Sequence, residues 1–265
     1  MPIHLKLALV MSLMLAACGA RDPLEALVPG ERGRVVRILD GDALVLDTGQ
    51  SVRLVGLEAP APERREREGE PFARESARML EDMALGRRVR LYYAGLTRDR
   101  YDRALAHVVT DDALGPRLWL NLEMARRGGA RVRTWPDTAL SADALVAAER
   151  GAREAGLGLW ALERYRVRPA RDLPTGSRGF MILEGILGEA RRESGGEAAC
   201  HRPLLASGII LEMTPAAGEM CAIEAGHLVR VRGWLSGGRL DVTHPANLEI
   251  LPRGPAHVAG SGDPT

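Results

Sequence analysis

The sequence predicts a mainly β protein with some helix, of the α+β class. The expected architecture is a five-stranded barrel of the OB type with about three helices, followed by a second small β-barrel-like domain. Three observations favour this fold. Residues 33–109 hold five short apolar runs, with one helical pattern between the third and the fourth. A linker rich in Arg, Pro and Gly follows at 166–178, and beyond it the apolar runs are again short and alternate as strands do.

The first domain, residues 33–165, is expected to open with three strands joined by turns. DGD at 40–42 marks the first turn, and DTGQ at 47–50 marks a hairpin in which Gly49 is free to adopt positive φ. The five expected strands lie at 33–39, 43–46, 51–57, 89–93 and 104–109. His107, in the last of them, is expected to be buried in the barrel wall rather than to act as a base.

Helical periodicity appears in three segments of the same domain. The first, over 71–85, starts with a proline that suits a first turn and is closed by Gly86. The other two helices are expected at 118–128 and 139–156. After the linker, a C-terminal all-β domain is expected over 179–252, and the Gly/Pro-rich residues 253–265 are expected to be a flexible tail.

The first eighteen residues are typical of an export signal. MPIHLK supplies a positive start, and LALVMSLMLAA is an apolar run too short to span a bilayer comfortably. The LAAC that ends at Cys18 resembles a lipobox, which implies a lipidated cysteine, a membrane-anchored mature chain and a tether over 19–32. Gly19 resembles the sorting pattern of outer-membrane lipoproteins that face the periplasm. The alternative is an ordinary signal peptide cut near Ala20, which gives a periplasmic or secreted protein.

Two further cysteines, Cys200 and Cys221, remain if Cys18 carries lipid. In an oxidising compartment they favour a disulfide that closes a loop of about 20 residues and contributes roughly 3 kcal/mol. Two free buried thiols are the alternative. A metal site is disfavoured because no second pair of ligands has the spacing of a zinc finger.

The charge balance limits how the chain can bind a polyanion. With 36 basic and 35 acidic residues, its net charge is +1, which excludes strong overall attraction to nucleic acid. A local patch must therefore do any such binding. Two basic runs, ARRGGARVR at 125–133 and ERYRVRPAR at 163–171, could steer a polyanion or form a solvated surface.

Four motifs occur in order along the first domain: DGDA at 40–43, RLVGLEAPA at 53–61, DRYDR at 99–103 and GLGLW at 156–160. Together they resemble the staphylococcal-nuclease (thermonuclease) family over about half of the chain. The resemblance implies an OB-type barrel with three helices and a Ca²⁺-dependent phosphodiesterase site. Such chemistry needs arginines to neutralise the charged transition state, carboxylates to hold a hard cation, and a glutamate to orient water.

Matched to the family pattern, Arg53 and Arg103 are the arginines that grip the phosphate. Asp42 matches a metal-binding aspartate, and Glu58 occupies the second metal-ligand position with a side chain one methylene longer, which implies a weakened site. Arg100 and Tyr101 match positions that contact a terminal phosphate in the family, so they are expected to bind substrate.

Two positions depart from the family pattern. Asp102 replaces a glycine, and its carboxylate could pair with Arg103 and compete with substrate. Ala61 falls on the catalytic glutamate, and a methyl group cannot activate water. Glu63 lies two residues on, between stiffening prolines, and is the candidate replacement; the alternative is a solvated charge in a loop.

These observations favour an exported, membrane-anchored nuclease-like protein, a candidate Ca²⁺-dependent phosphodiesterase on DNA or RNA with an impaired site. The first alternative is an inactive pseudonuclease that binds nucleic acid or protein in the cell envelope. A purely structural tether is the second alternative. The C-terminal domain resembles an extension found on some proteobacterial members of the family, and an unknown protein partner for it is left open.

Overall fold

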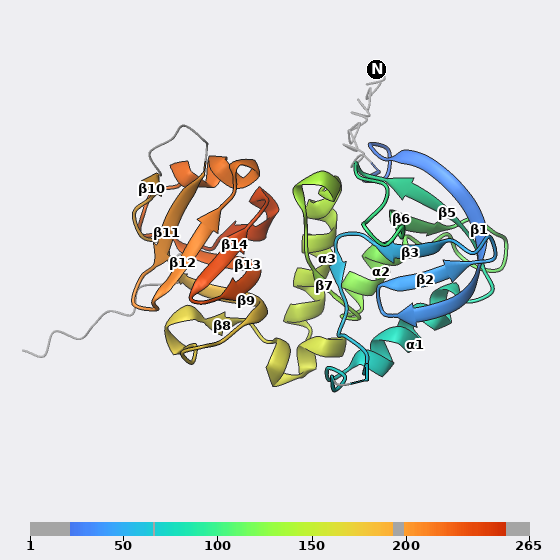
Figure 1. Cartoon of the computed structure of the whole chain (residues 1–265), viewed down its shortest axis with the longest axis horizontal. Helices are drawn as coiled ribbons and strands as arrows, with labels where there is room; N and C mark the ends of the chain where they lie inside the picture. Colours follow the sequence, from blue (N-terminus) through green and yellow to red (C-terminus); the bar gives the residue numbers. More distant parts are fainter. Residues whose placement is uncertain (1–21, 66, 193–198, 253–265) are drawn as a thin grey trace, which may run out of the picture.

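The computed structural model describes residues 22–65, 67–192 and 199–252 (Figure 1). The expected signal peptide, the candidate lipidation site Cys18 and the expected tail 253–265 lie outside the described residues. Within the part of the chain that is described, no helix is both long enough and apolar enough to cross a membrane.

The first domain is a closed five-stranded barrel, as the sequence predicts. Its strand order is β1-β2-β3-β6-β5, with β3 and β6 parallel and the other pairs antiparallel. Leu44, Leu54, Leu91 and Val108 are fully buried inside it. The bounds are β1 Val28–Asp40, β2 Ala43–Leu46, β3 Ser51–Leu54, β5 Arg88–Tyr93 and β6 Ala104–Thr110.

The barrel begins earlier than expected, so the tether predicted over 19–32 is wrong for its described part. β1 starts at Val28, which pairs with Tyr93 of β5. Leu24 and Leu27 are buried in the barrel core, so the segment just before β1 packs against the barrel through its apolar side chains. The sequence between the lipidation candidate and the barrel is therefore shorter than expected.

Three α-helices cover the barrel: α1 Ala73–Ala84, α2 Leu120–Arg126 and α3 Ala142–Glu154. Ser76, Leu80 and Met83 form the buried face of α1, and Gly86 follows the helix at φ +76°. A short two-stranded sheet, β4 Leu57–Glu58 with β7 Arg131–Val132, joins the end of β3 to the segment between α2 and α3. A 3₁₀ turn, η1 Pro136–Thr138, precedes α3.

The second β domain that the sequence predicts is present as an eight-stranded sheet. The path is β10-β11-β12-β14-β13-β9-β8, and β15 pairs with β13. Its core is separate from that of the barrel and includes Leu183, Leu211, Val231 and Leu240. The bounds are β8 Arg168–Pro169, β9 Gly179–Ile186, β10 Arg191–Arg192, β11 Cys200–Leu204, β12 Ile209–Met213, β13 Leu228–Ser236, β14 Arg239–Val242 and β15 Leu248–Ile250, with 3₁₀ helices η5 Pro215–Ala222 and η6 Pro245–Asn247.

The linker predicted over 166–178 is partly structured, which corrects that expectation. β8 lies within it and pairs in parallel with β9, and Ala170 is buried in the second core. The preceding turns also pack, because Trp160 and Tyr165 form a small cluster with Ile182 of β9. The turns are η2 Gly158–Ala161, η3 Glu163–Tyr165 and η4 Ala170–Asp172.

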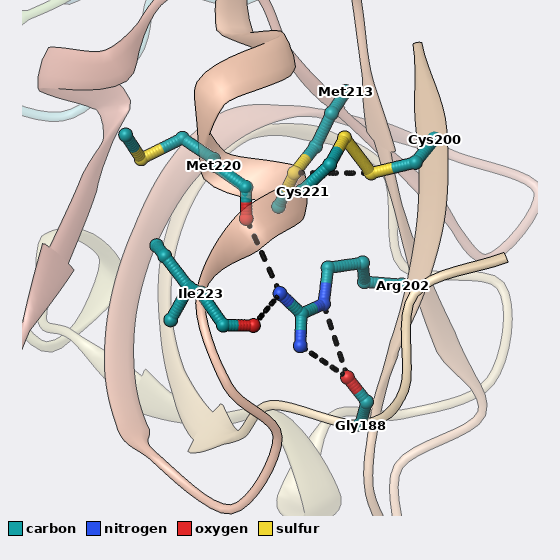
Figure 2. Close-up of a disulfide and its surroundings, with 7 residues drawn as sticks. All are labelled: Gly188, Cys200, Arg202, Met213, Met220, Cys221 and Ile223. Carbon is teal, nitrogen blue, oxygen red and sulfur yellow. Dashed lines mark hydrogen bonds between the residues drawn. A yellow bond between two sulfur atoms is a disulfide. The ribbon is translucent and has the colours of Figure 1, made fainter. Parts of the chain in front are cut away.

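Cys200 and Cys221 form a disulfide with an S–S distance of 2.03 Å. Figure 2 shows it above the buried guanidinium of Arg202, close to the thioether of Met213. Arg202 donates hydrogen bonds to the carbonyl oxygens of Gly188, Met220 and Ile223. The disulfide and this arginine together fix η5 against β11, and burial lowers the pKa of the Arg202 guanidinium.

A buried ion pair joins the two domains. Glu149 of α3 and Arg232 of β13 are both almost fully inaccessible, and Arg232 donates to the Glu149 carboxylate. The second Glu149 oxygen accepts from the Val132 amide at 2.7 Å, and Arg232 also reaches Glu249 at 3.0 Å. Figure 1 shows α3 on the side of the barrel that faces the second sheet. The domains are thus docked by paired charge as well as by apolar contact.

Candidate active site

Arg53 and Arg103 line one pocket of about 290 Å³ on the barrel surface. Arg53 lies in β3 between Val52 and Leu54, whose side chains point into the core, so strand alternation turns the arginine outward. Arg103 immediately precedes β6. Because β3 and β6 are parallel neighbours, with Arg53 opposite Leu105, the two guanidinium groups reach the same side of the barrel.

Asp42 and Glu58 flank the Arg53 guanidinium. Its Nη1 lies 3.3 Å from Asp42 Oδ1, and its Nη2 lies 3.3 Å from Glu58 Oε2. A lone arginine on an apolar strand therefore has the charged partners that its burial requires. The two arginines and the two acids, which are distant in sequence, lie around a single region of the surface.

The DGD turn places Asp42 by close packing. The Asp42 amide donates to Asp40 Oδ1 at 3.0 Å, and Asp42 Oδ2 accepts from the Ala59 amide at 2.9 Å. A Cβ on Gly41 would lie 1.7 Å from the Ser76 hydroxyl of α1, so the turn can approach the helix only with glycine there. Burial raises the pKa of Asp42 to about 8, although nearby Arg53 acts to lower it.

Ca²⁺ prefers carboxylate oxygens, and the donor chemistry at this site fits such a cation in part. Asp42 and Glu58 supply carboxylates, and burial raises the pKa of Asp42, a shift that a bound cation would oppose. However, the described residues contain no group of three His, Cys, Asp or Glu side chains arranged to hold a metal. A cation here would be coordinated by the two carboxylates of Asp42 and Glu58 and would take its remaining ligands from water or substrate.

Arg103 pairs with Asp99 rather than with Asp102, which corrects the expected pairing. Its Nε donates to Asp99 Oδ2 at 2.7 Å, and Asp99 Oδ1 accepts from the amides of Tyr101 and Arg103. Asp102 adopts a left-handed conformation with φ +60°, and its carbonyl accepts from Gln50. Asp99 is better placed because it closes the turn that carries the arginine.

Arg100 and Tyr101 lie beside this site rather than inside the pocket that holds both arginines. Tyr101 is 65% exposed, with the guanidinium carbon of Arg100 at 4.8 Å and that of Arg103 at 5.7 Å from its ring centroid. Tyr101 lines a separate hollow with Gln50 and Asp102. The ring is therefore accessible at the edge of the site, in contact with Arg103.

Glu63, the candidate replacement for the missing glutamate, does not join the arginines. It is exposed and lines a different hollow, with Asp40 and Glu70. Instead, Glu70 comes closest to Ala61: its Oε2 accepts from the Ala61 amide at 2.9 Å, and its own amide donates to the Ala61 carbonyl at 2.8 Å. These two bonds hold Ala61 and Glu70 together, whereas the side chain of Glu63 stays exposed.

Sequence reasoning also missed Arg133 and Trp135, which line the pocket with Arg53 and Arg103. Arg133 Nη1 donates to Glu58 Oε2 at 3.0 Å, and its guanidinium carbon lies 4.7 Å from the Trp135 ring centroid. The antiparallel pairing of β4 with β7 makes this contact possible. The only sequence signal was the basic run 125–133, which by itself did not point to the pocket.

Comparison with known proteins agrees with this geometry. The family model described as staphylococcal nuclease homologue matches residues 51–162. A thermonuclease of Staphylococcus intermedius is 29% identical over 136 residues, which cover 50% of this chain and 78% of that protein. An uncharacterized endonuclease of Escherichia coli O157:H7 is 34% identical over 130 residues, which cover 48% of this chain and 76% of that protein. A probable endonuclease of Pyrenophora tritici-repentis is 35% identical over 125 residues, but this chain spans only 43% of its length.

Proposed function

Because this chain belongs to the staphylococcal nuclease family, we propose that it hydrolyses phosphodiester bonds in DNA or RNA, slowly, at the pocket of Arg53 and Arg103. The observation that carries the proposal is the convergence of these arginines with Asp42 and Glu58. Two guanidinium groups in one pocket suit the charge that develops on the two non-bridging oxygens of a phosphodiester in its transition state.

In this proposal the chain's own residues bind and orient the phosphate. Arg53 and Arg103 leave part of their present ion pairs, with Asp42, Glu58 and Asp99, to donate to phosphate oxygens. Asp42 and Glu58 would hold Ca²⁺, which supplies additional positive charge against the phosphate when it is bound. The rate is low because Ala61 cannot orient water, and loss of a general base typically costs 10²–10⁴-fold.

The proposal includes export and anchoring. The apolar run before Cys18 and the LAAC motif support a lipoprotein that faces the periplasm from the outer membrane. The disulfide between Cys200 and Cys221 agrees with an oxidising compartment.

The test uses the chain from residue 21 onward, with labelled single-stranded DNA and RNA, in Ca²⁺ or in chelator. We expect slow cleavage in Ca²⁺ that is lost in Arg103→Ala. Arg127→Ala is the matched control, because Arg127 lies outside the pocket and, among the described residues, forms its ion pair with Glu123 of α2. Equal cleavage by the Arg103→Ala variant would rule out the proposed site.

A second candidate function is nucleic-acid binding without cleavage. It is favoured by Ala61 at the position of the catalytic glutamate and by the ion pairs that already engage both arginines. Ala61→Glu separates the candidates. If wild type binds nucleic acid in a salt-dependent way without cutting, and Ala61→Glu starts to cut in Ca²⁺, the protein is a binding module on an intact nuclease scaffold.

A further inference from the structure

A further hollow lies between the two domains, next to the site. Its volume is about 510 Å³, and it includes Glu58 and Ala61 on the barrel side and Phe180 and Trp234 on the side of the second sheet. Glu58 also accepts from Arg53, so this interdomain hollow begins where the pocket of Arg53 and Arg103 ends.

Arginine dominates the interdomain hollow. Six arginines line it, against the two glutamates Glu58 and Glu70; the six are Arg67, Arg131, Arg164, Arg166, Arg168 and Arg178. The two basic runs of the sequence, 125–133 and 163–171, meet here although they are far apart in the chain. A chain with a net charge of only +1 therefore concentrates positive charge at one place.

Part of this charge is uncompensated. Arg67 and Arg164 lie near Glu70, and Arg166 pairs with Glu163. By contrast, Arg168 and Arg178 have no ion-pair partner among the described residues, and both reach solvent. These two arginines are available to an anion from outside.

Aromatic rings connect the interdomain hollow to the pocket of the two arginines. The guanidinium carbon of Arg133 lies 4.7 Å from the ring centroid of Trp135, in the pocket, and 5.3 Å from that of Trp234, in the hollow. Trp135 and Trp234 are 49% and 43% exposed, so each ring keeps surface for another flat group. Exposed aromatic rings that alternate with arginines are the arrangement by which proteins hold single strands.

We infer that the second domain completes a track for single-stranded nucleic acid, which runs from Arg53 and Arg103 past Arg133 into the interdomain hollow. Its substrate class rests on the proposed function. Phosphates of the strand contact Arg168 and Arg178, and an unpaired base stacks on Trp234. A single strand is the occupant because the bases of a duplex are covered by their neighbours and offer no free face to a tryptophan. The second domain is thus part of substrate recognition rather than a spacer.

The test measures binding in chelator, so that no cleavage occurs, with the full chain from residue 21. The probes are a labelled dinucleotide and a labelled single strand of about twelve nucleotides, within the range that one OB fold covers. The variants are Arg168→Ala with Arg178→Ala, and Trp234→Ala. The matched control is Arg191→Ala with Arg192→Ala, two exposed arginines on β10 of the same domain.

For the long strand, the double variant at Arg168 and Arg178 should reduce the slope of log affinity against log salt by about 1.4, since each phosphate contact on a single strand contributes about 0.7. Trp234→Ala should weaken the long strand roughly 5- to 150-fold. The dinucleotide, which reaches only the pocket, and the control variant should show no change. Trp234→Phe, which keeps a ring, should recover most of the affinity and shows that loss in Trp234→Ala is not misfolding.

Several results would overturn the inference: unchanged affinity and salt slope in both variants, equal losses for the dinucleotide, or wild-type binding to anionic phospholipid vesicles but not to the strand. The proposed function is tested separately by cleavage in Ca²⁺. If the wild type cleaves in Ca²⁺ but the variants bind the strand as tightly as the wild type, the track is wrong and the nuclease function stands. If the variants lose strand affinity but the wild type does not cleave, the nuclease function is wrong and the track stands.

Discussion

Replacing Glu149 by alanine should strongly destabilise the protein, because this one carboxylate serves both domains. It is fully buried and accepts from the Val132 amide at 2.7 Å and from Arg232. Its removal leaves Arg232, which is 1% exposed, with Glu249 at 3.0 Å and the Val132 carbonyl at 3.4 Å, and it also takes a carboxylate partner from Arg153. Breaking a buried pair by removing one partner costs about 3–5 kcal/mol, which includes the unpaired charge and amide left behind.

The assay is urea and thermal unfolding followed by tryptophan fluorescence. The expected loss corresponds to a fall in Tm of roughly 6–20 °C for a protein of this size. Glu149→Gln combined with Arg232→Met should be less destabilising than Glu149→Ala, since neither buried charge remains. Glu163→Ala removes one partner of an exposed ion pair and should leave stability nearly unchanged. A loss below about 1 kcal/mol in Glu149→Ala would refute the view that paired charge docks the domains.

Three further predictions follow from buried groups elsewhere. Burial lowers the pKa of His107 to about 4 from its ordinary 6.5. The stability that the neutral imidazole contributes is therefore complete above pH 6.5 and is lost as the pH falls from 6.5 to 4. Urea titrations across this range should show a fall of roughly 3 kcal/mol in the free energy of unfolding, and His107→Gln should lack this fall. Replacing both Cys200 and Cys221 by alanine should cost about 3 kcal/mol in the chain-entropy estimate, and an unchanged urea midpoint would contradict this. Gly41→Ala should cost about 1–3 kcal/mol by overpacking against Ser76 and should impair phosphate binding at Arg53; recovery of binding on adding Ser76→Gly would identify the clash as the cause.

The barrel and the position of Arg53 could be predicted because their causes are local. Turn residues and short apolar runs determine the strands, and an arginine between apolar neighbours must find charged partners. Glu70 could not be found in this way. Its contact with Ala61 depends on how the loop 61–70 closes, and sequence distance favoured Glu63 instead.

Contacts that arise when strands distant in the chain pair with each other could not be predicted from the sequence either. Arg133 meets Glu58 only because β4 and β7 pair across about seventy residues. Likewise the linker could not be recognised as partly structured, since β8 is too short to show any alternation and becomes a strand only through its neighbour β9.

The parallel pairing of β3 with β6 bears on when the site can form. Arg53 and Leu105 are partners in the ladder, yet about fifty residues separate them. In the same way, β1 can pair with β5 only after a long intervening segment has formed. Topologies dominated by such distant pairings fold slowly, because a long loop must close before any contact rewards it. A nascent chain that ends before β6 has strands but no assembled phosphate pocket. If the chain is exported as proposed, the pocket of Arg53 and Arg103 would form only after both β3 and β6 had crossed the membrane.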